Sequence, residues 1–578
     1  LSFPFLLLLF IELGLRLFSY RADFQPVFRE LSEEPGYMVT NPDYASRYFP
    51  AFTPKVAPSP FRKDKTDKEF RVVVLGGSST QGFPYNFYNS FSARLEYLLM
   101  MHTQQLNIEV INLGMTAVNS YVLWDLKEEV AAINPDAVII YAGHNEYYGS
   151  FGVGSSMFGL GSSVGLKRSI LRLKNLRLYQ AIEQILAPEE DSSNRTMMAR
   201  VVKESEIDYG SELYNQGLRQ FEENMSETLG YFKDQDIPVF MGTLASNLKD
   251  QPPLGESEES MDYFDAAKGD YAQGEKDSAL KNYMLSRDYD NIRFRAPSDL
   301  NEKIRELAGN YEVEVIDIHQ LSIDSSASGI PDNSLFDDHL HPNAVGNQLV
   351  GEAFYQGLSG HPELKEKLVP NPLSVRIPIS QFEQATAFIP IARLKSGYPF
   401  RKDVSQQVEL ASFRNTMERL SSRSYIDSVA AYAWSEERQT TLALTDVINH
   451  ATRNRDSVTV MQHYVNLAQL QVFNEGILKK GVVYAINNRN LDIYTAYLLE
   501  FILNKERKDP FFANSLSAVY LLNGDLENAE FWLMEANELD PDNANILYNI
   551  ARLKVMQKDT AAAKIYFERY REMQQRSQ

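Results

Sequence analysis

The sequence contains no cysteine in its 578 residues. Disulfide bonds, catalytic thiols and cysteine-ligated zinc are therefore excluded. This absence leaves the cellular compartment open, because cytosolic and secreted proteins alike can lack cysteine. Basic residues are also in short supply: 57 Lys and Arg stand against 77 Asp and Glu, so the formal net charge is -20. Since a phosphate-binding surface needs a basic stripe, we expect no nucleic acid as a partner.

The apolar run at the amino-terminal end of the sequence is short. Residues 1–11 read LSFPFLLLLFI, and Glu12 and Arg16 then interrupt the run. By itself it is shorter than the roughly 20 apolar residues that span a bilayer. We interpret residues 1–20 as an apolar anchor or export segment, which predicts contact with a membrane. A docked amphipathic helix is the alternative interpretation.

The remaining composition is that of a globular protein, with 44% hydrophobic and 12% aromatic residues. A chain of this length is expected to form two or three folding units. Residues 21–68 are rich in proline and charge, which predicts a linker or an arm that wraps the next domain. Residues 69–370 alternate short apolar segments with helix-like stretches. From 371 to 578 helical periodicity dominates, so we expect an α-helical domain there.

The short apolar segments of the central part predict the strands of one sheet. Strands that alternate with helices indicate a parallel sheet covered on both faces, which is a three-layer α/β/α fold. In such a sheet ligands bind beyond the carboxyl ends of the strands, where Ser78, Asn112 and Asn145 fall. A helical hairpin insertion is predicted over about 255–290. The predicted strands are 70–75, 107–112, 137–141, 237–241 and 312–317.

A candidate nucleophile follows the first of these strands. Residues 76–80 read Gly-Gly-Ser-Ser-Thr and precede a helix-like stretch. Ser78 would sit on the sharp turn with its hydroxyl exposed and with backbone N–H groups of the helix start beside it. A phosphate-binding loop is the rival interpretation, but no Gly-Lys-Ser/Thr follows. A loop serine without a catalytic role is the simpler alternative.

A carboxylate and a histidine three residues apart form the candidate base. Asp338 can bond one ring nitrogen of His341 and leave the other nitrogen facing a serine. His339 is a competing base, but the residue three positions before it is Phe336, which cannot orient a ring. A metal site made of Asp338, His339 and His341 is another alternative, but no third histidine lies nearby in the sequence. We therefore expect no metal.

Two further segments supply candidate donors to an oxyanion. Residues 143–146 read Gly-His-Asn-Glu, and the amide of Asn145 follows a predicted strand end. The turn after Asn112, over 113–117, offers backbone N–H groups. Neither segment is specific when taken alone.

The four segments, in this order along the chain, resemble the blocks of the SGNH/GDSL hydrolases, a family of esterases, lipases and carbohydrate deacetylases. The resemblance spans roughly 70–358 and implies a flavodoxin-like domain that needs no cofactor. It implies that Ser78 is the nucleophile and that Asp338 and His341 complete the triad. It also implies an oxyanion hole made by the N–H groups of Ser78 and Ala117 and the side chain of Asn145.

Three residues depart from the pattern of that family. Gly77 stands where an aspartate is usual, which removes a structural hydrogen bond rather than a catalytic group. Ala117 stands at the oxyanion glycine, with Gly114 as the fallback for this role. Because the donor is a backbone N–H, alanine can serve if its dihedral angles permit. Glu146 stands where an aspartate is usual, and we expect it to be structural.

The end of the chain contains an internal repeat. Residues 524–529 align with 558–563 at a spacing of 34 residues, and Pro541 lies between the two units. This pattern over about 510–577 resembles tetratricopeptide (TPR) repeats, which pair two antiparallel helices per 34 residues. The resemblance implies a protein or peptide partner for these helices.

The resemblances together imply a serine-dependent ester hydrolase that acts on an acyl lipid or an acetylated glycan. An O-acetyltransferase for a cell-envelope glycan is one alternative, because its acylation chemistry is the same. A TPR scaffold with an inactive hydrolase domain is another, although the intact Ser, Asn, Asp and His set argues against it. The family also suggests a membrane-anchored protein of the bacterial cell envelope, with the hydrolase domain outside the cytoplasm.

Overall fold

A computed structural model describes most residues of the protein. These are 2–18, 20, 26–49, 54–103, 106–155, 163–186, 206–371, 379–401, 404–436, 438–488, 493–505 and 509–576. We call the described residues between 69 and 371 the α/β domain, and those from 379 to 576 the helical region.

A five-stranded sheet forms the centre of the α/β domain. Every neighbouring pair of strands runs parallel, and the spatial order is β5-β4-β6-β7-β8. Counted from β4 this is the order 2-1-3-4-5 of flavodoxin-like sheets, whose ligands bind where the order reverses. That reversal lies between β4 and β6. The strands are β4 (Glu69–Gly76), β5 (Asn107–Asn112), β6 (Ala137–Tyr141), β7 (Val239–Gly242) and β8 (Glu314–Ile316).

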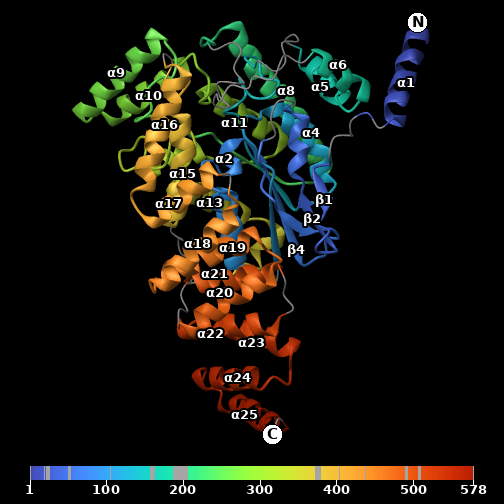
Figure 1. The fold of residues 1–578 in the computed structure, drawn as a ribbon, viewed down its shortest axis with the longest axis vertical. Coiled ribbons are helices and arrows are strands. Elements are labelled where there is room, and N and C mark those ends of the chain that lie inside the picture. Colours follow the sequence, from blue (N-terminus) through green and yellow to red (C-terminus); the bar gives the residue numbers. More distant parts are fainter. Residues whose placement is uncertain are drawn as a thin grey trace.

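Helices cover both faces of this sheet. The helices α3 (Phe91–His102) and α13 (Ala344–Leu358) pack together, whereas α4 (Ser120–Ala131) packs on α8 (Glu212–Asp234), which also contacts α11 (Ser298–Tyr311). Strand β4 is buried along its whole length, as expected for a strand between two helical layers. The predicted three-layer α/β/α architecture is confirmed (Figure 1).

Shorter elements complete this domain. The helices α9 and α10 form a hairpin with a small core of its own, in which Phe264 packs on Tyr283. Gly274 ends α9 in a left-handed conformation, with φ of 84°, that suits glycine. The remaining elements are α2 (Ser78–Gln81), η2 (Phe87–Asn89), α5 (Val164–Leu173), α6 (Arg177–Leu186), α9 (Glu258–Gln273), α10 (Lys276–Tyr289), α12 (Ile318–Ser325) and α14 (Pro362–Lys365).

The segment before β4 is folded onto the domain. It forms an antiparallel sheet of β1 (Phe28–Glu30), β2 (Tyr37–Thr40) and β3 (Pro60–Arg62), with the short helix η1 (Pro42–Arg47) after β2. Arg71 of β4 is buried, and its guanidinium donates to Glu109 of β5 at 2.8 Å and to the carbonyl of Arg62 at 2.6 Å. The described part of 21–68 therefore packs as an arm against the sheet.

The first helix, α1 (Ser2–Leu17), lies beside α6. Glu12 accepts the backbone N–H groups of Arg177 and Leu178 at 3.2 and 2.8 Å and pairs with Arg16 at 2.7 Å. Leucines on α1 are exposed to solvent. Throughout the described ranges, no helix has both the length and the apolar content needed to cross a membrane.

The helical region is all α, as predicted, and it extends away from the sheet toward the carboxyl terminus (Figure 1). Its helices pack as successive neighbours, and the pairs α22–α23 and α24–α25 make the most extensive contacts. The helices are α15 (Gln381–Leu394), α16 (Gln406–Ser421), α17 (Tyr425–Ser435), α18 (Thr440–Arg453), α19 (Ser457–Leu470), α20 (Glu475–Asn487), α21 (Ile493–Lys505), α22 (Pro510–Leu522), α23 (Leu526–Leu539), α24 (Ala544–Met556) and α25 (Thr560–Arg576).

Buried polar contacts join the helical region to the α/β domain. The side chain of Asn504 on α21 accepts the N–H of Ile108 at 2.8 Å and donates to its carbonyl at 2.9 Å. Ile108 belongs to β5, the edge strand of the sheet, so Asn504 pairs with backbone groups that an edge strand leaves open. Asn89 donates to Glu383 at the start of α15. The two parts therefore share one buried interface.

Candidate active site

Ser78 lies where the sequence predicts it, immediately after the central strand. Strand β4 ends at Gly76, Gly77 caps α2, and Ser78 is the first residue of α2. A Cβ at Gly76 would lie 2.1 Å from Oγ1 of Thr80 and 2.2 Å from the carbonyl of Tyr141. Only glycine therefore allows α2 to turn so tightly over the end of β4 and present Ser78 at the reversal of strand order.

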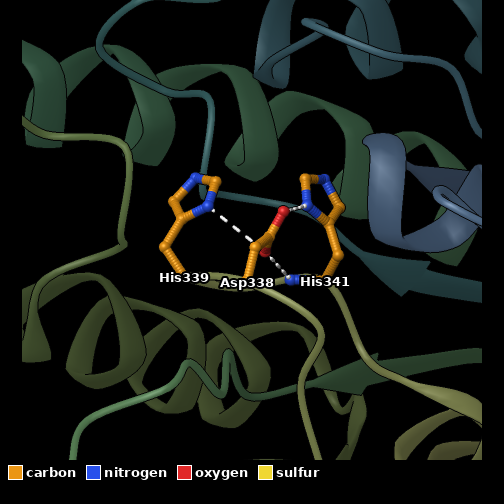
Figure 2. A group of neighbouring side chains, drawn as sticks. All are labelled: Asp338, His339 and His341. Atoms are coloured by element: carbon orange, nitrogen blue, oxygen red, sulfur yellow. Dashed lines mark hydrogen bonds and ion pairs between the residues drawn. The ribbon is translucent and has the colours of Figure 1, made fainter. Parts of the chain in front are cut away.

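Asp338 and His341 come from the turn before α13, and the structure brings them to Ser78. Oδ2 of Asp338 lies 2.6 Å from Nδ1 of His341, and Nε2 of His341 lies 2.8 Å from Oγ of Ser78. Oδ1 of Asp338 accepts the backbone N–H groups of Leu340 and His341, both at 2.9 Å. The carboxylate is thus fixed by the turn itself, and it orients the ring (Figure 2).

The charge of Asp338 is held in a fully buried position. Burial by itself raises the pKa of this carboxyl, but the neighbouring His341 and His339 rings and their hydrogen bonds hold its pKa well below its ordinary value. Asp338 is therefore a carboxylate at neutral pH. Such a group stabilises an imidazolium on His341 when the ring takes a proton.

His339 faces the same carboxylate from the side opposite His341 (Figure 2). Its Nδ1 lies 3.2 Å from Oδ1 of Asp338, and burial lowers the pKa of His339, which keeps the ring neutral. It is His341 whose ring nitrogen lies within hydrogen-bond distance of Oγ of Ser78. This geometry favours His341 over His339 as the base.

The side chains of Asp338, His339 and His341 could also be considered as metal ligands, because their ligand atoms lie within 4.8 Å of one another. However, Oδ1 of Asp338 already accepts two backbone N–H groups, and Oδ2 accepts Nδ1 of His341. A cation would have to displace that hydrogen bond from His341. The donor set therefore fits a carboxylate that orients a ring better than it fits a metal site.

The two predicted oxyanion residues beside Ser78 line the same cavity. Ala117 has φ of 60°, in the left-handed region that favours glycine. The fallback, Gly114, does not fit, because its N–H donates to Oδ1 of Asn112 at 2.8 Å. Asn145 approaches the turn before Ser78, since a Cβ on Gly77 would lie 3.0 Å from its Nδ2.

The side chains of Asn112 and Glu146 hold the loops around Ser78 and Asn145 in place. Asn112 donates to the carbonyl of Thr80 at 2.8 Å, which ties the end of β5 to α2. Glu146 is buried and accepts the N–H and the hydroxyl of Ser120 at 3.1 and 2.7 Å. Burial raises the pKa of Glu146 to about 7 despite these bonds from Ser120. Glu146 thus fixes the Asn145 loop to the start of α4, in a structural position.

His144, next to Asn145, is not placed to act as a base. Its Nδ1 accepts the N–H of Ala296 at 3.1 Å. Burial, and then the neighbouring His339, His341 and Arg287, lower the pKa of His144 to about 3. The ring is therefore neutral and supports the loop after β6.

A cavity of about 960 Å³ opens at Ser78, and we call it the Ser78 cavity. Sequence reasoning found the part of its lining that belongs to the four blocks. It missed the helical region, because helical periodicity does not tell which helix face will meet a site some 300 residues earlier. Lining residues from the α/β domain include Ser78, Phe83, Ala117, Asn145, Phe294 and His341, and those from the helical region include Phe382, Ile389, Arg393, Trp434 and Arg438.

Two family models match this chain. Residues 74–349 match the GDSL-like lipase/acylhydrolase family, and residues 513–543 match a tetratricopeptide repeat. The first match contains Ser78, Asp338 and His341, and the second spans most of α22 and α23. A comparison with curated proteins found no match.

Several solved structures are similar to parts of the chain. An acetyl xylan esterase, AlAXEase, is 14% identical with a TM-score of 0.28, over 50% of this chain and 98% of its own. A lipase/acylhydrolase from Enterococcus faecalis is 16% identical with a TM-score of 0.27, over 52% of this chain and 98% of its own. MamA from Desulfovibrio magneticus RS-1 is 16% identical with a TM-score of 0.22, over 28% of this chain and 94% of its own.

Proposed function

We propose that this protein, in which residues 74–349 form a GDSL-like lipase/acylhydrolase domain, hydrolyses esters with Ser78 as its nucleophile. The observation that carries the proposal is the continuous hydrogen-bonded chain from Oγ of Ser78 through both nitrogens of His341 to Oδ2 of Asp338. That chain has the order of roles that nucleophilic acyl transfer needs.

Acylation begins when Oγ of Ser78 attacks the ester carbonyl carbon while Nε2 of His341 takes the hydroxyl proton. The carbonyl π bond becomes an oxyanion, which the N–H groups of Ser78 and Ala117 and the amide of Asn145 stabilise. The oxyanion then re-forms the carbonyl, the bond to the alcohol oxygen breaks, and His341 protonates that oxygen. Asp338 keeps its charge throughout and stabilises the imidazolium.

Deacylation repeats the same steps with water. His341 takes a proton from a water molecule whose oxygen attacks the acyl carbon. The tetrahedral intermediate collapses, the bond to Oγ of Ser78 breaks, and His341 returns the proton to Ser78. An alcohol acceptor in place of water would make the protein an acyltransferase, and the detection of a transferred acyl group would favour that alternative.

The remaining proposals concern partners and location. The match to a tetratricopeptide repeat supports a protein or peptide partner for α22–α25. The apolar α1 supports contact of residues 1–20 with a membrane, and the bacterial cell envelope is the location we propose. Pull-down with α24–α25 surface variants and fractionation of cells that express the full chain test these two proposals.

Hydrolysis of p-nitrophenyl acetate by the full chain tests the serine mechanism. Ser78→Ala is expected to lower kcat by at least about 1000-fold, because the nucleophile is lost while the fold is kept. Ser79→Ala is the matched control: this neighbouring serine is also buried, and its hydroxyl has no hydrogen-bond partner among the residues that the structure describes. The control should retain wild-type kcat. Full activity in Ser78→Ala would refute the assignment.

A further inference from the structure

Helix α15 turns one face toward the Ser78 cavity along its whole length. The lining residues on α15 recur at intervals of three and four, which is the spacing of a single helix face. The face is therefore a wall of the cavity and not an incidental contact. Its residues are Phe382, Thr386, Ile389, Pro390, Arg393 and Leu394.

Helix α17 closes the same wall with small side chains and one large one. Ala430 and Ala433 line the cavity, and their short side chains leave the space beside α15 open. Trp434 also lines it and is 46% exposed, which places its ring at the opening. The cavity therefore has a broad interior next to α17.

The charged side chains on this wall are already neutralised. Arg393 pairs with Glu409 on α16, and Arg438 donates to Asp446 on α18 at 2.7 Å. An anionic substrate group would have to compete with these carboxylates. The wall therefore does not favour recognition of an anion.

The opposite side of the cavity offers apolar side chains beside polar ones such as Lys55, Gln81 and Asn145. Phe83, Phe294 and Leu340 line it from the α/β domain, and the ring of Phe83 lies 4.5 Å from that of His341. An acetyl group would leave most of the roughly 960 Å³ unfilled. Apolar side chains on both sides of a large space are instead complementary to a long apolar group that displaces water.

We propose that α15 and α17 of the helical region select the substrate of this esterase, and that they select an ester with an aliphatic acyl chain of roughly six carbons or more. The proposal rests on the proposed serine hydrolysis and adds to it the residues that choose the acyl group. Ile389, Ala433 and Trp434 are its specificity-determining residues. In this arrangement the acyl chain of the substrate lies between α15 and Phe83, and the ester carbonyl carbon faces Ser78.

Hydrolysis of p-nitrophenyl acetate and octanoate by the full chain tests this assignment. In the wild type, kcat/KM should rise from acetate to octanoate, by up to roughly fourfold per added methylene that is buried. Ala433→Trp fills the cavity from a half-buried position. It should lower the ratio of kcat/KM for octanoate to kcat/KM for acetate at least tenfold.

Ser435→Trp is the matched control, because Ser435 lies on the same helix, is exposed and does not line the cavity. It should leave both esters unaffected. Thermal unfolding of both tryptophan variants within a few degrees of wild type shows that the fold is kept. If the wild type prefers acetate and Ala433→Trp leaves the ratio of the two esters unchanged, the acyl-chain assignment is overturned while Ser78-dependent hydrolysis stands.

A binding measurement separates the two proposals if no ester is hydrolysed. Calorimetric titration of the Ser78→Ala protein with decanoate should show binding. Addition of Ala433→Trp to this protein should raise the Kd for decanoate at least tenfold. Binding that responds in this way supports the wall even when the proposed hydrolysis fails. Absence of decanoate binding to the Ser78→Ala protein overturns the wall as an acyl-chain site.

Discussion

Ala117 holds a backbone conformation in which an L-amino acid is strained. Its φ of 60° places it in the left-handed region, yet its position beside Ser78 gives its N–H a place in the proposed oxyanion hole. The strain is confined to one residue, and the carbonyl of Ala117 accepts the N–H of Ser150 at 2.9 Å, which holds the loop in place. Backbone donors can therefore be kept in position by a residue other than glycine.

Ala117→Gly is expected to stabilise the protein by about 0.5–1 kcal/mol, because relief of the left-handed strain exceeds the entropy that glycine adds to the unfolded chain. Esterase kcat should stay within a few-fold, since the N–H remains. Urea unfolding and p-nitrophenyl acetate hydrolysis measure the two effects. A loss of stability would show that the methyl group of Ala117 packs favourably enough to outweigh the strain.

The residues of the site differ in how far the sequence predicts them. Asp338 and His341 are three positions apart on one turn. Their hydrogen bond is therefore local and can be predicted from the sequence motif. Ser78 is distant in sequence, but the parallel sheet brings the loops after its strands to one edge. The second ring on Asp338, that of His339, and the bond from Asn112 to Thr80 depend on side-chain directions, which the sequence pattern does not contain.

At the scale of elements, the loop after a strand can be held by the start of the helix that precedes the strand. Glu146, in the loop after β6, bonds to Ser120 at the start of α4 from a fully buried position. The pKa of Glu146 is raised to about 7 from the ordinary value of 4.5, so the neutral carboxyl is favoured in the folded state. Its contribution to stability is complete below about pH 4.5 and is lost as the pH rises through about 7.

Glu146→Gln is expected to remove this pH dependence, because glutamine resembles the neutral carboxyl at every pH. The variant should match wild type near pH 4.5 and exceed it above pH 7 by on the order of 3 kcal/mol. Urea unfolding at pH 4.5 and pH 8 measures the difference. Glu128→Gln, on the exposed side of α4, is the control and should show no such change. Equal pH dependence in wild type and Glu146→Gln would mean that Glu146 is ionised at pH 8 without cost.

The strands and helices of the α/β domain were predictable because each strand is a short apolar run that ends in a turn. The arm over 21–68 was less predictable, since β1, β2 and β3 have three or four residues each and pair with one another rather than with the main sheet. Strands this short carry too few side chains for an alternating pattern to appear. The packing of α15 and α17 beside the Ser78 cavity was also hard to predict, because it depends on contacts with residues far away in the sequence.

At the scale of the whole molecule, the helical region covers the open edge of the sheet. Asn504 of α21 accepts the N–H of Ile108 and donates to its carbonyl. An edge strand is a place where another chain can pair, and α21 packs against it here. The helical region therefore contributes to the stability of the α/β domain as well as to the wall of its cavity.

Asn504→Leu is expected to destabilise the protein by about 1–3 kcal/mol, because it removes two buried hydrogen bonds between α21 and β5. The melting temperature of the full chain measures the loss. Asn488→Leu serves as control, since Asn488 is exposed and its side chain donates to the carbonyl of Tyr484 within the same helix end. A melting temperature that is equal in both variants would show that water reaches Ile108 and replaces Asn504.

Two different stretches of the chain line the Ser78 cavity. The proposed catalytic groups lie between 78 and 341, whereas α15 and α17, which line the cavity, lie beyond 380. If α15 and α17 select the substrate as proposed, substitutions in those two helices redirect the protein to new molecules and leave its chemistry intact. Two proteins with the same four blocks and different helices in this place would carry out one reaction on different compounds.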